Sequence, residues 1–228
     1  MITTDNKAIM KKEKLLQGKR ACIFDLDGTL FDSLGIWSEI DARFFAMHGK
    51  QVPEDYNQRI AHKNFHDIAL FTKEEYGFKE SVPEMMKIWD DWSKEAYQKK
   101  IQTKPGAREF VKELYDKGFA LAVVTSNRRE LYEPCLVRNG IYDCFSVLLN
   151  TNDLNTTKAD SFIFEEASRR LKVPASETLV FDDVSAALKA AKDAGYTTVG
   201  IYDKINLPDI ENILKYADIF LGSFLELK

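Results

Sequence analysis

The sequence predicts an α/β fold in which a parallel sheet is covered by helices and interrupted by an inserted helical domain. From Arg20 onward, short apolar runs alternate with longer segments of helical spacing, which is typical of a parallel sheet with helical crossovers. The apolar runs are nearly continuous, as expected for strands buried on both faces. One interval of roughly eighty residues breaks the alternation and is several times longer than an ordinary crossover.

The predicted strands define the sheet. Each is a short run rich in β-branched and aromatic residues. The segments are Ala21–Asp25, Ala120–Thr125, Phe145–Leu149, Thr178–Asp182 and Thr197–Ile201, with Ala217–Leu221 as a candidate sixth strand. Between them the spacing predicts helices near Ala107–Lys117, Arg128–Asn139, Asp160–Leu171 and Val184–Ala194. Glycines at several helix ends support these boundaries.

The long interval has helical spacing and no convincing strand. Apolar and aromatic residues recur every three or four positions in Ile36–His48, Phe65–Tyr76 and Pro83–Tyr97, so these segments can pack as a small bundle. We therefore expect a Rossmann-like core formed by residues 1–32 and 104–228, with a small α-helical cap domain at residues 33–103 inserted into it.

Composition excludes several classes of protein. The 228 residues carry 32 Lys and Arg against 36 Asp and Glu, and this net charge of −4 lacks the basic footprint of a nucleic-acid or anionic-membrane binder. Three cysteines without metal-ligand spacing favour a reducing compartment. No signal peptide or membrane-spanning run is visible. We expect a cytoplasmic protein that is a monomer or a weak dimer.

Polar residues end or directly follow the predicted strands, at the edge where open α/β sheets bind ligands. Acids lie at the ends of the first and fourth strands, hydroxyl and amide side chains lie at the end of the second, and a lysine precedes the third core helix. These residues are Asp25, Asp27, Thr125, Ser126, Asn127, Lys158, Asp182 and Asp183. So many acids at one edge would repel one another unless a cation joined them, and clustered hard oxygen ligands suit Mg²⁺.

This grouping suggests phosphoryl transfer. Asp25 is placed to attack phosphorus and form an aspartyl-phosphate. Asp27 can protonate the leaving oxygen and then deprotonate the attacking water. We expect Asp25, Asp27 and Asp183 to bind the metal, and Asp182 to reach it through water.

The transferring phosphoryl group needs its own donors. Thr125 and Lys158 are the candidates to hold its oxygens, and Ser126 and Asn127 can add N–H donors. Two other interpretations of the first acidic segment are a solvated turn and a calcium-binding loop. A calcium-binding loop requires more oxygen ligands and a glutamate at its last position, whereas apolar residues occupy ligand positions here.

The segment FDLDGTLFDS (Phe24–Ser33) resembles the first motif of the haloacid dehalogenase-like hydrolase superfamily. VVTSN (Val123–Asn127), Lys158 and VFDDVSAALKAAKDAG (Val180–Gly195) resemble the second, third and fourth motifs, in the family's order. The insert resembles the small cap of the subfamily that contains phosphoglycolate phosphatases and beta-phosphoglucomutases. The resemblance implies a Mg²⁺-dependent phosphotransferase with the residue roles given above.

Some residues depart from the family pattern. Ala159 follows Lys158 where many relatives have proline, and Asp182 replaces a frequent glutamate. Mutases of this group commonly carry a histidine at the position of Trp37, which favours a phosphatase here. The expected function is hydrolysis of a small phosphorylated metabolite. A beta-phosphoglucomutase-like enzyme is the alternative, and a non-catalytic interaction protein is the alternative from another class.

Substrate selection is expected in the insert, because a cap over the strand ends would contact the leaving group. Arg59, His62 and Lys63 form a polar, cationic cluster that can reach an anionic metabolite, although a solvated loop is an equal alternative. Trp37 is a further candidate, either lining the cleft or packing within the first helix of the insert.

Overall fold

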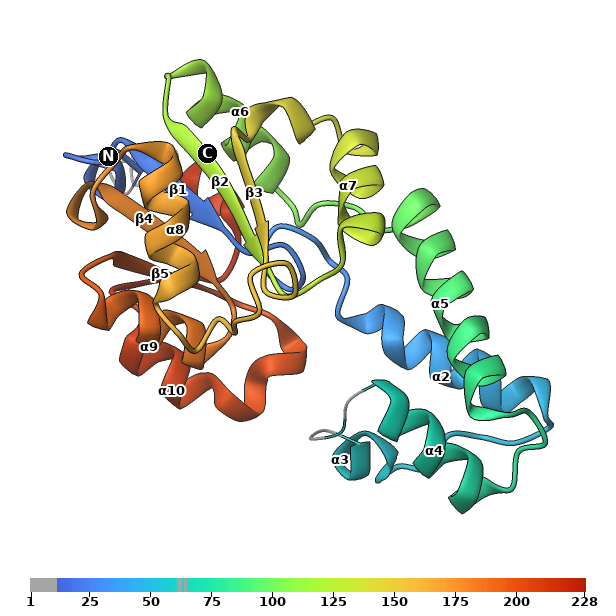
Figure 1. Cartoon of the computed structure of the whole chain (residues 1–228). Coiled ribbons are helices and arrows are strands. Elements are labelled where there is room, and N and C mark those ends of the chain that lie inside the picture. The colour runs from blue at the N-terminus through green and yellow to red at the C-terminus, as the bar shows by residue number, and fades with distance from the viewer. Residues whose placement is uncertain (1–11, 61–62, 64) are drawn as a thin grey trace, which may run out of the picture. The chain divides into compact units, whose positions relative to one another are not determined.

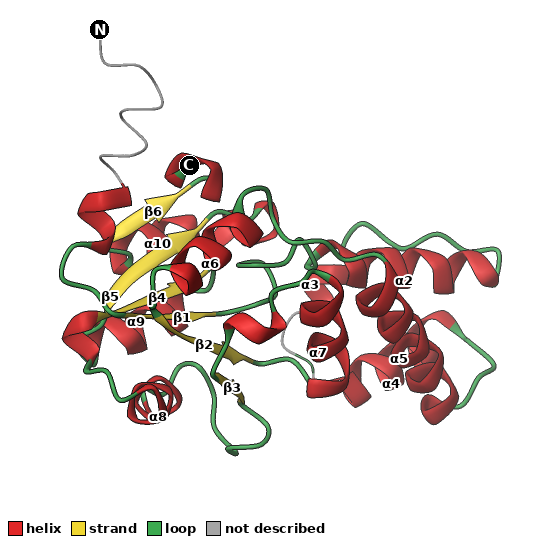
Figure 2. Cartoon of the chain, turned by 90° about the horizontal axis from the view of Figure 1, so that it is seen from above, coloured by secondary structure: helices red, strands yellow, loops and turns green. Residues whose placement is uncertain are grey.

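Six parallel strands form one sheet in the order β3-β2-β1-β4-β5-β6 (Figures 1 and 2). The computed structural model describes residues 12–60, 63 and 65–228. The strands are β1 (Ala21–Phe24), β2 (Ala120–Thr125), β3 (Val147–Asn150), β4 (Thr178–Asp182), β5 (Thr197–Ile201) and β6 (Ile219–Leu221). Because β1 lies between β2 and β4, the strand order reverses at β1, and open α/β sheets bind ligands at the carboxyl ends of strands at such a point. The predicted α/β fold is confirmed.

Three strands, β1, β3 and β6, differ in their boundaries from the predicted ones. β1 ends at Phe24, so Asp25 is the first residue beyond it, although the Asp25 N–H still donates to the Phe181 carbonyl at 3.0 Å. β3 begins at Val147 instead of Phe145, because Tyr142–Cys144 forms a 3₁₀ turn before it. The candidate sixth strand is present as β6, shorter than its apolar run suggested.

Alternating side chains fill the two faces of the sheet. On one face Ile23 and Val180 pack against α8 and α9. On the other, the rings of Phe24 and Phe181 stack with centroids 4.5 Å apart, and both contact Phe110 of α6. Each such buried side chain stabilises the fold by roughly 1.5–3 kcal/mol, which explains why uninterrupted apolar runs become central strands.

The helices of this unit are α6 (Ala107–Asp116), α7 (Arg129–Arg138), α8 (Phe162–Leu171), α9 (Ser185–Asp193) and α10 (Ile210–Tyr216). The first four match the predicted helices. α8 begins two residues late because the Asp160 carboxylate accepts a hydrogen bond from the Phe162 N–H at 2.9 Å and holds a turn there. α10 was not predicted; its seven residues follow Pro208 and are too short for a clear periodic pattern.

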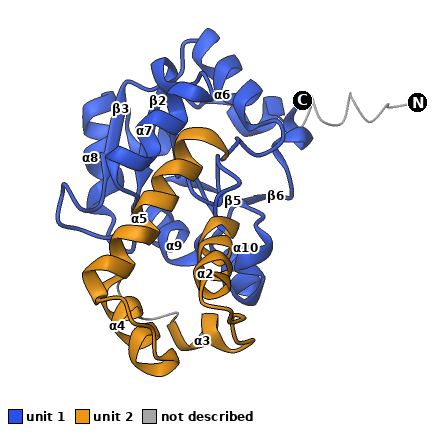
Figure 3. Ribbon diagram, turned by 90° about the vertical axis from the view of Figure 1, so that its right-hand side faces the viewer, with its two compact units in different colours: residues 1–34, 101–228 blue, residues 35–100 orange. Residues whose placement is uncertain are grey.

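The chain divides into two compact units, which we call the core unit (residues 1–34 and 101–228) and the helical unit (residues 35–100) (Figure 3). The helical unit contains α2 (Gly35–Met47), α3 (Tyr56–Ile60), α4 (Phe65–Tyr76) and α5 (Val82–Lys99), with α5 packed against α2 and α4. Its interior is aromatic: Phe44 contacts Phe78 and Trp89, with ring centroids 5.0 and 5.5 Å apart. No described helix is both long and apolar enough to cross a membrane.

Candidate active site

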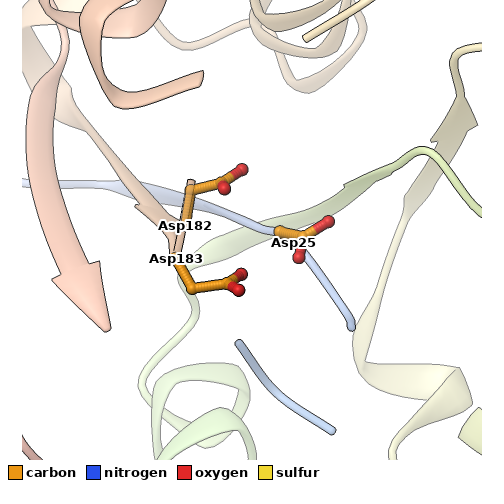
Figure 4. A group of neighbouring side chains, drawn as sticks. All are labelled: Asp25, Asp182 and Asp183. Atoms are coloured by element: carbon orange, nitrogen blue, oxygen red, sulfur yellow. The ribbon is translucent and has the colours of Figure 1, made fainter. Parts of the chain in front are cut away.

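Three aspartates gather at the carboxyl ends of β1 and β4. Asp25 follows β1, Asp182 ends β4, and Asp183 comes directly after it. Each offers a carboxylate oxygen, and these oxygens all lie within 4.8 Å of one another (Figure 4). All three residues are buried. We call Asp25, Asp182 and Asp183 the carboxylate cluster.

Lys158 supplies a positive charge to the carboxylate cluster. Its Nζ lies 2.8 Å from Asp25 Oδ1 and 2.8 Å from Asp182 Oδ2. Burial disfavours the charged ammonium, but the carboxylates of Asp182 and Asp25 outweigh burial and raise the pKa of Lys158 above its usual range. The lysine therefore stays protonated and holds two of the three acids together.

One ammonium does not balance three buried carboxylates. Burial raises the pKa of Asp25 well above its usual range, with Lys158 opposing this shift and Asp182 and Asp183 adding to it. Burial and then repulsion by Asp182 raise the pKa of Asp183 to about 7. Such a group of hard oxygen ligands, short of positive charge, fits a divalent cation such as Mg²⁺.

Asp183 is fixed by two further side chains. Thr29 Oγ1 donates to Asp183 Oδ1 at 2.7 Å, and Asn206 Nδ2 donates to Asp183 Oδ2 at 2.5 Å. Gly28 has φ +84°, and a Cβ there would lie 2.1 Å from Asp183 Oδ2. Only glycine leaves room for the loop after β1 to approach this carboxylate so closely.

The side chain of Asp27 is held apart from the carboxylate cluster. Ser33 Oγ donates to its Oδ1 at 2.6 Å, and Asn127 Nδ2 donates to its Oδ2 at 2.8 Å. Asp27 is partly exposed, in contrast to buried Asp25 two residues earlier. The two acids of the first motif therefore occupy different surroundings, which allows them different roles.

The turn at the end of β2 lies beside Asp27. Thr125 is buried, and its Oγ1 accepts a hydrogen bond from the Asn127 N–H at 3.0 Å. Ser126 is exposed. This turn places the Asn127 side chain on Asp27, so the second motif positions the first.

The substrate residues predicted in the insert belong to the helical unit. Trp37 lies on α2 and is 38% exposed. Arg59 pairs with Glu75 at 2.8 Å, and the cationic groups of Arg59 and Lys63 lie 4.8 and 5.3 Å from the ring centroid of Phe71. His62 lies outside the described residues.

Three residues of the site were not assigned roles from the sequence. Thr29 and Ser33 lie inside the first motif, where hydroxyls near paired acids are a usable signal. Asn206 lies in the 3₁₀ segment Lys204–Asp209 after β5, and no local sequence pattern links it to Asp183, which is 23 residues away.

Comparisons with known proteins agree with this geometry. A family model described as haloacid dehalogenase-like hydrolase matches residues 22–201. Validoxylamine A 7′-phosphate phosphatase of Streptomyces hygroscopicus subsp. limoneus is 31% identical over 92% of this chain and 96% of its own. The bifunctional riboflavin kinase/FMN phosphatase of Arabidopsis thaliana is 26% identical over 96% of this chain, which spans 57% of that relative's length.

A solved structure is also similar to this chain. The structure of a proposed beta-phosphoglucomutase from Thermotoga maritima matches with a TM-score of 0.81 and 26% identity, and the match covers 91% of this chain and 96% of the other. These matches support a phosphatase or phosphoglucomutase-like enzyme. The chain belongs to the haloacid dehalogenase-like hydrolases, in the small-cap subfamily of phosphatases and phosphoglucomutases.

Proposed function

We propose that this chain is a Mg²⁺-dependent phosphatase that hydrolyses a small phosphorylated metabolite through an aspartyl-phosphate on Asp25. The observation that carries the proposal is the carboxylate cluster at the end of β1 and β4, with Asp27 held separately beside it. Asp25 and Asp183 are the residues we assign to the ion, with Asp182 beside them. Asp27 stays a predicted ligand, although Ser33 and Asn127 hold its carboxylate.

In the first step a carboxylate oxygen of Asp25 forms a bond to phosphorus, and the bond between phosphorus and the leaving oxygen breaks. Lys158 binds the other carboxylate oxygen and orients the nucleophile. Asp27 gives a proton to the leaving oxygen, so the alcohol departs neutral. Mg²⁺ supplies positive charge that offsets the negative charge of the phosphoryl oxygens.

In the second step water attacks the phosphorus of the aspartyl-phosphate. Asp27 takes the proton from that water, and Asp25 leaves as a carboxylate while inorganic phosphate is released. Ser33 and Asn127 keep the Asp27 carboxylate at one place through both transfers. Thr125 is the hydroxyl we assign to the phosphoryl oxygens, and the N–H groups of Ser126 and Asn127 and the Lys158 ammonium remain predicted contacts to them.

Asp25→Asn tests this proposal. We expect phosphate release from p-nitrophenyl phosphate with Mg²⁺ to fall by about a thousandfold or more, because the amide is a poor nucleophile. Asp193→Asn, an exposed acid at the far end of α9, is the matched control and should keep the activity. Chelation should stop the reaction and added Mg²⁺ should restore it. Release that survives Asp25→Asn would contradict the nucleophile assignment.

The same assay separates the alternatives. The similarity to the Thermotoga maritima structure favours a mutase as the second candidate. Conversion of one sugar phosphate into its isomer without net phosphate release would identify a mutase. Absence of turnover across a panel of phosphorylated metabolites would indicate the non-catalytic interaction protein.

A further inference from the structure

A second site lies wholly inside the helical unit. A cavity of about 260 Å³ is lined there by Trp37 and Asp41 of α2, Phe65 of α4 and Trp89 of α5, and three isoleucines complete its wall. We call it the helical-unit cavity. Its volume suits a small organic molecule.

Asp41 is the charged residue of this cavity. It is 8% exposed, and no described residue forms a hydrogen bond or ion pair with its carboxylate. Burial alone raises its pKa to about 7. A carboxylate kept in apolar surroundings without a partner among the described residues is costly, so its presence favours a group that binds there.

Aromatic rings form the other functional part of the cavity. The ring centroids of Trp37 and Phe65 are 6.1 Å apart, and those of Phe65 and Trp89 are 5.9 Å apart. The Trp89 indole nitrogen is buried, and none of the residues that the structure describes accepts a hydrogen bond from it. Faces of aromatic rings attract organic cations, and the attraction strengthens when water is excluded.

We propose that the helical-unit cavity binds a small organic ammonium ion, with the Asp41 carboxylate as its counter-charge and Trp37, Phe65 and Trp89 as its walls. The complementarity is direct: among the described lining residues Asp41 carries the sole charge, and a ligand with one positive charge neutralises it. The Trp89 indole N–H can donate a hydrogen bond to the hydroxyl oxygen of such a ligand. This site concerns the helical unit alone and does not rest on the proposed hydrolase activity.

Binding should tighten as the pH rises from 6 to 8, because the carboxylate must be ionised to attract the cation. Tyr56 is the neighbouring titratable group that interacts with the Asp41 charge. Burial raises the pKa of the Tyr56 phenol, so this side chain stays neutral throughout the range. No other described lining residue titrates.

Calorimetric titration of the full chain with choline tests the proposal. The matched probe is 3,3-dimethyl-1-butanol, which has the same shape and no charge. Choline should bind at least about tenfold more tightly than the alcohol, since only choline gains the charge interaction. Equal affinity of the two probes, or no binding of choline at millimolar concentration, would overturn the proposal.

Variants locate the site. Asp41→Asn should weaken choline binding by about tenfold or more, and Phe65→Leu should weaken it severalfold. Glu39→Gln is the control, because it removes an exposed carboxylate from the same helix and should leave the affinity unchanged. Circular dichroism confirms folding, and Phe65→Leu provides the test if Asp41→Asn does not fold. Unchanged affinity in a folded Asp41→Asn or Phe65→Leu protein would contradict the site.

Hydrolysis rates of two phosphate esters distinguish an ammonium group that is part of the substrate from one that belongs to a separate ligand. If phosphocholine is hydrolysed with a kcat/KM at least about tenfold above that of 3,3-dimethylbutyl phosphate, and Asp41→Asn removes the preference, the cation is part of the substrate. If choline binds without such a preference, it is a separate ligand of the helical unit. Calorimetry on Asp25→Asn keeps the binding result independent of any phosphatase activity.

Discussion

The core unit and the helical unit both bury aspartates, but they surround them differently. Asp25 is 4% exposed and Asp41 is 8% exposed, and burial raises the pKa of each. Asp25 has an ion pair with Lys158 and lies beside two further acids, whereas Asp41 has no charged partner among the described residues. In the core the charges depend on one another. In the helical unit the buried Asp41 carboxylate has no such charged neighbour within the part of the chain that the structure describes. Removing the Asp41 charge should therefore stabilise the protein, whereas removing the Lys158 charge should destabilise it.

The largest effect on stability is expected from Lys158→Met. The substitution leaves three buried carboxylates without their ammonium, and breaking a buried ion pair in this way costs roughly 3–5 kcal/mol. Urea unfolding at pH 8 in a chelating buffer measures the loss. The loss should shrink at pH 5, because protonation removes the uncompensated negative charge.

The matched control is Lys189→Met. Lys189 and Asp193 form an ion pair on the exposed side of α9, with Nζ 2.5 Å from Oδ2. Water already solvates both groups, so little change in the free energy of unfolding is expected. Equal losses in the two variants would show that burial does not make the Lys158 pairs special.

The contrast between the two units also explains which features of the structure could be predicted from the sequence. Strands and most helices followed from apolar periodicity, and the acids at the ends of β1 and β4 followed from the rule that ligands bind at the carboxyl ends of strands. Asn206 was missed because it lies in a 3₁₀ segment after β5. Its role depends on a contact 23 residues away, which no local pattern encodes.

Asp41 shows a second limit of prediction. In the sequence it is one polar residue within an amphipathic helix, and such positions are normally solvated. Whether its side chain is buried depends on how α4 and α5 pack against α2, which is tertiary information. By contrast, Asp25 follows a continuous apolar run, so its burial was predictable from its neighbours in the chain.

The second largest effect is expected from Asp41→Asn, and it should stabilise the protein. The folded-state pKa of about 7 lies above the ordinary value of 3.8, so the folded protein binds more protons than the unfolded chain between these pH values. Stability is therefore lost as the pH rises through this window, by up to about 4 kcal/mol from this group. Removing the carboxyl removes that loss.

Urea unfolding of the wild type and Asp41→Asn at pH 5 and pH 8 measures this difference. The variant should be more stable than the wild type by about 1–2 kcal/mol at pH 5 and by about 4 kcal/mol at pH 8, because ionisation of Asp41 opposes folding more strongly as the pH rises. Contributions from Asp25 and Asp183 cancel because both proteins contain them. The idea fails if the gap between the two proteins is the same at both pH values.

The smallest change in the free energy of unfolding is expected from removing one buried hydrogen bond between hydroxyl groups in each unit. Tyr196 donates to Ser168 Oγ at 2.9 Å in the core unit, and Tyr56 and Thr72 share a hydrogen bond of 2.7 Å in the helical unit. Tyr196→Phe and Tyr56→Phe should each cost about 1 kcal/mol, because each removes one neutral hydrogen bond. Similar losses, measured by urea unfolding at pH 7, would show that the two interiors treat neutral polar groups alike. The contrast between the units would then belong to their charges, whereas a loss several times larger in one variant would assign it to packing instead.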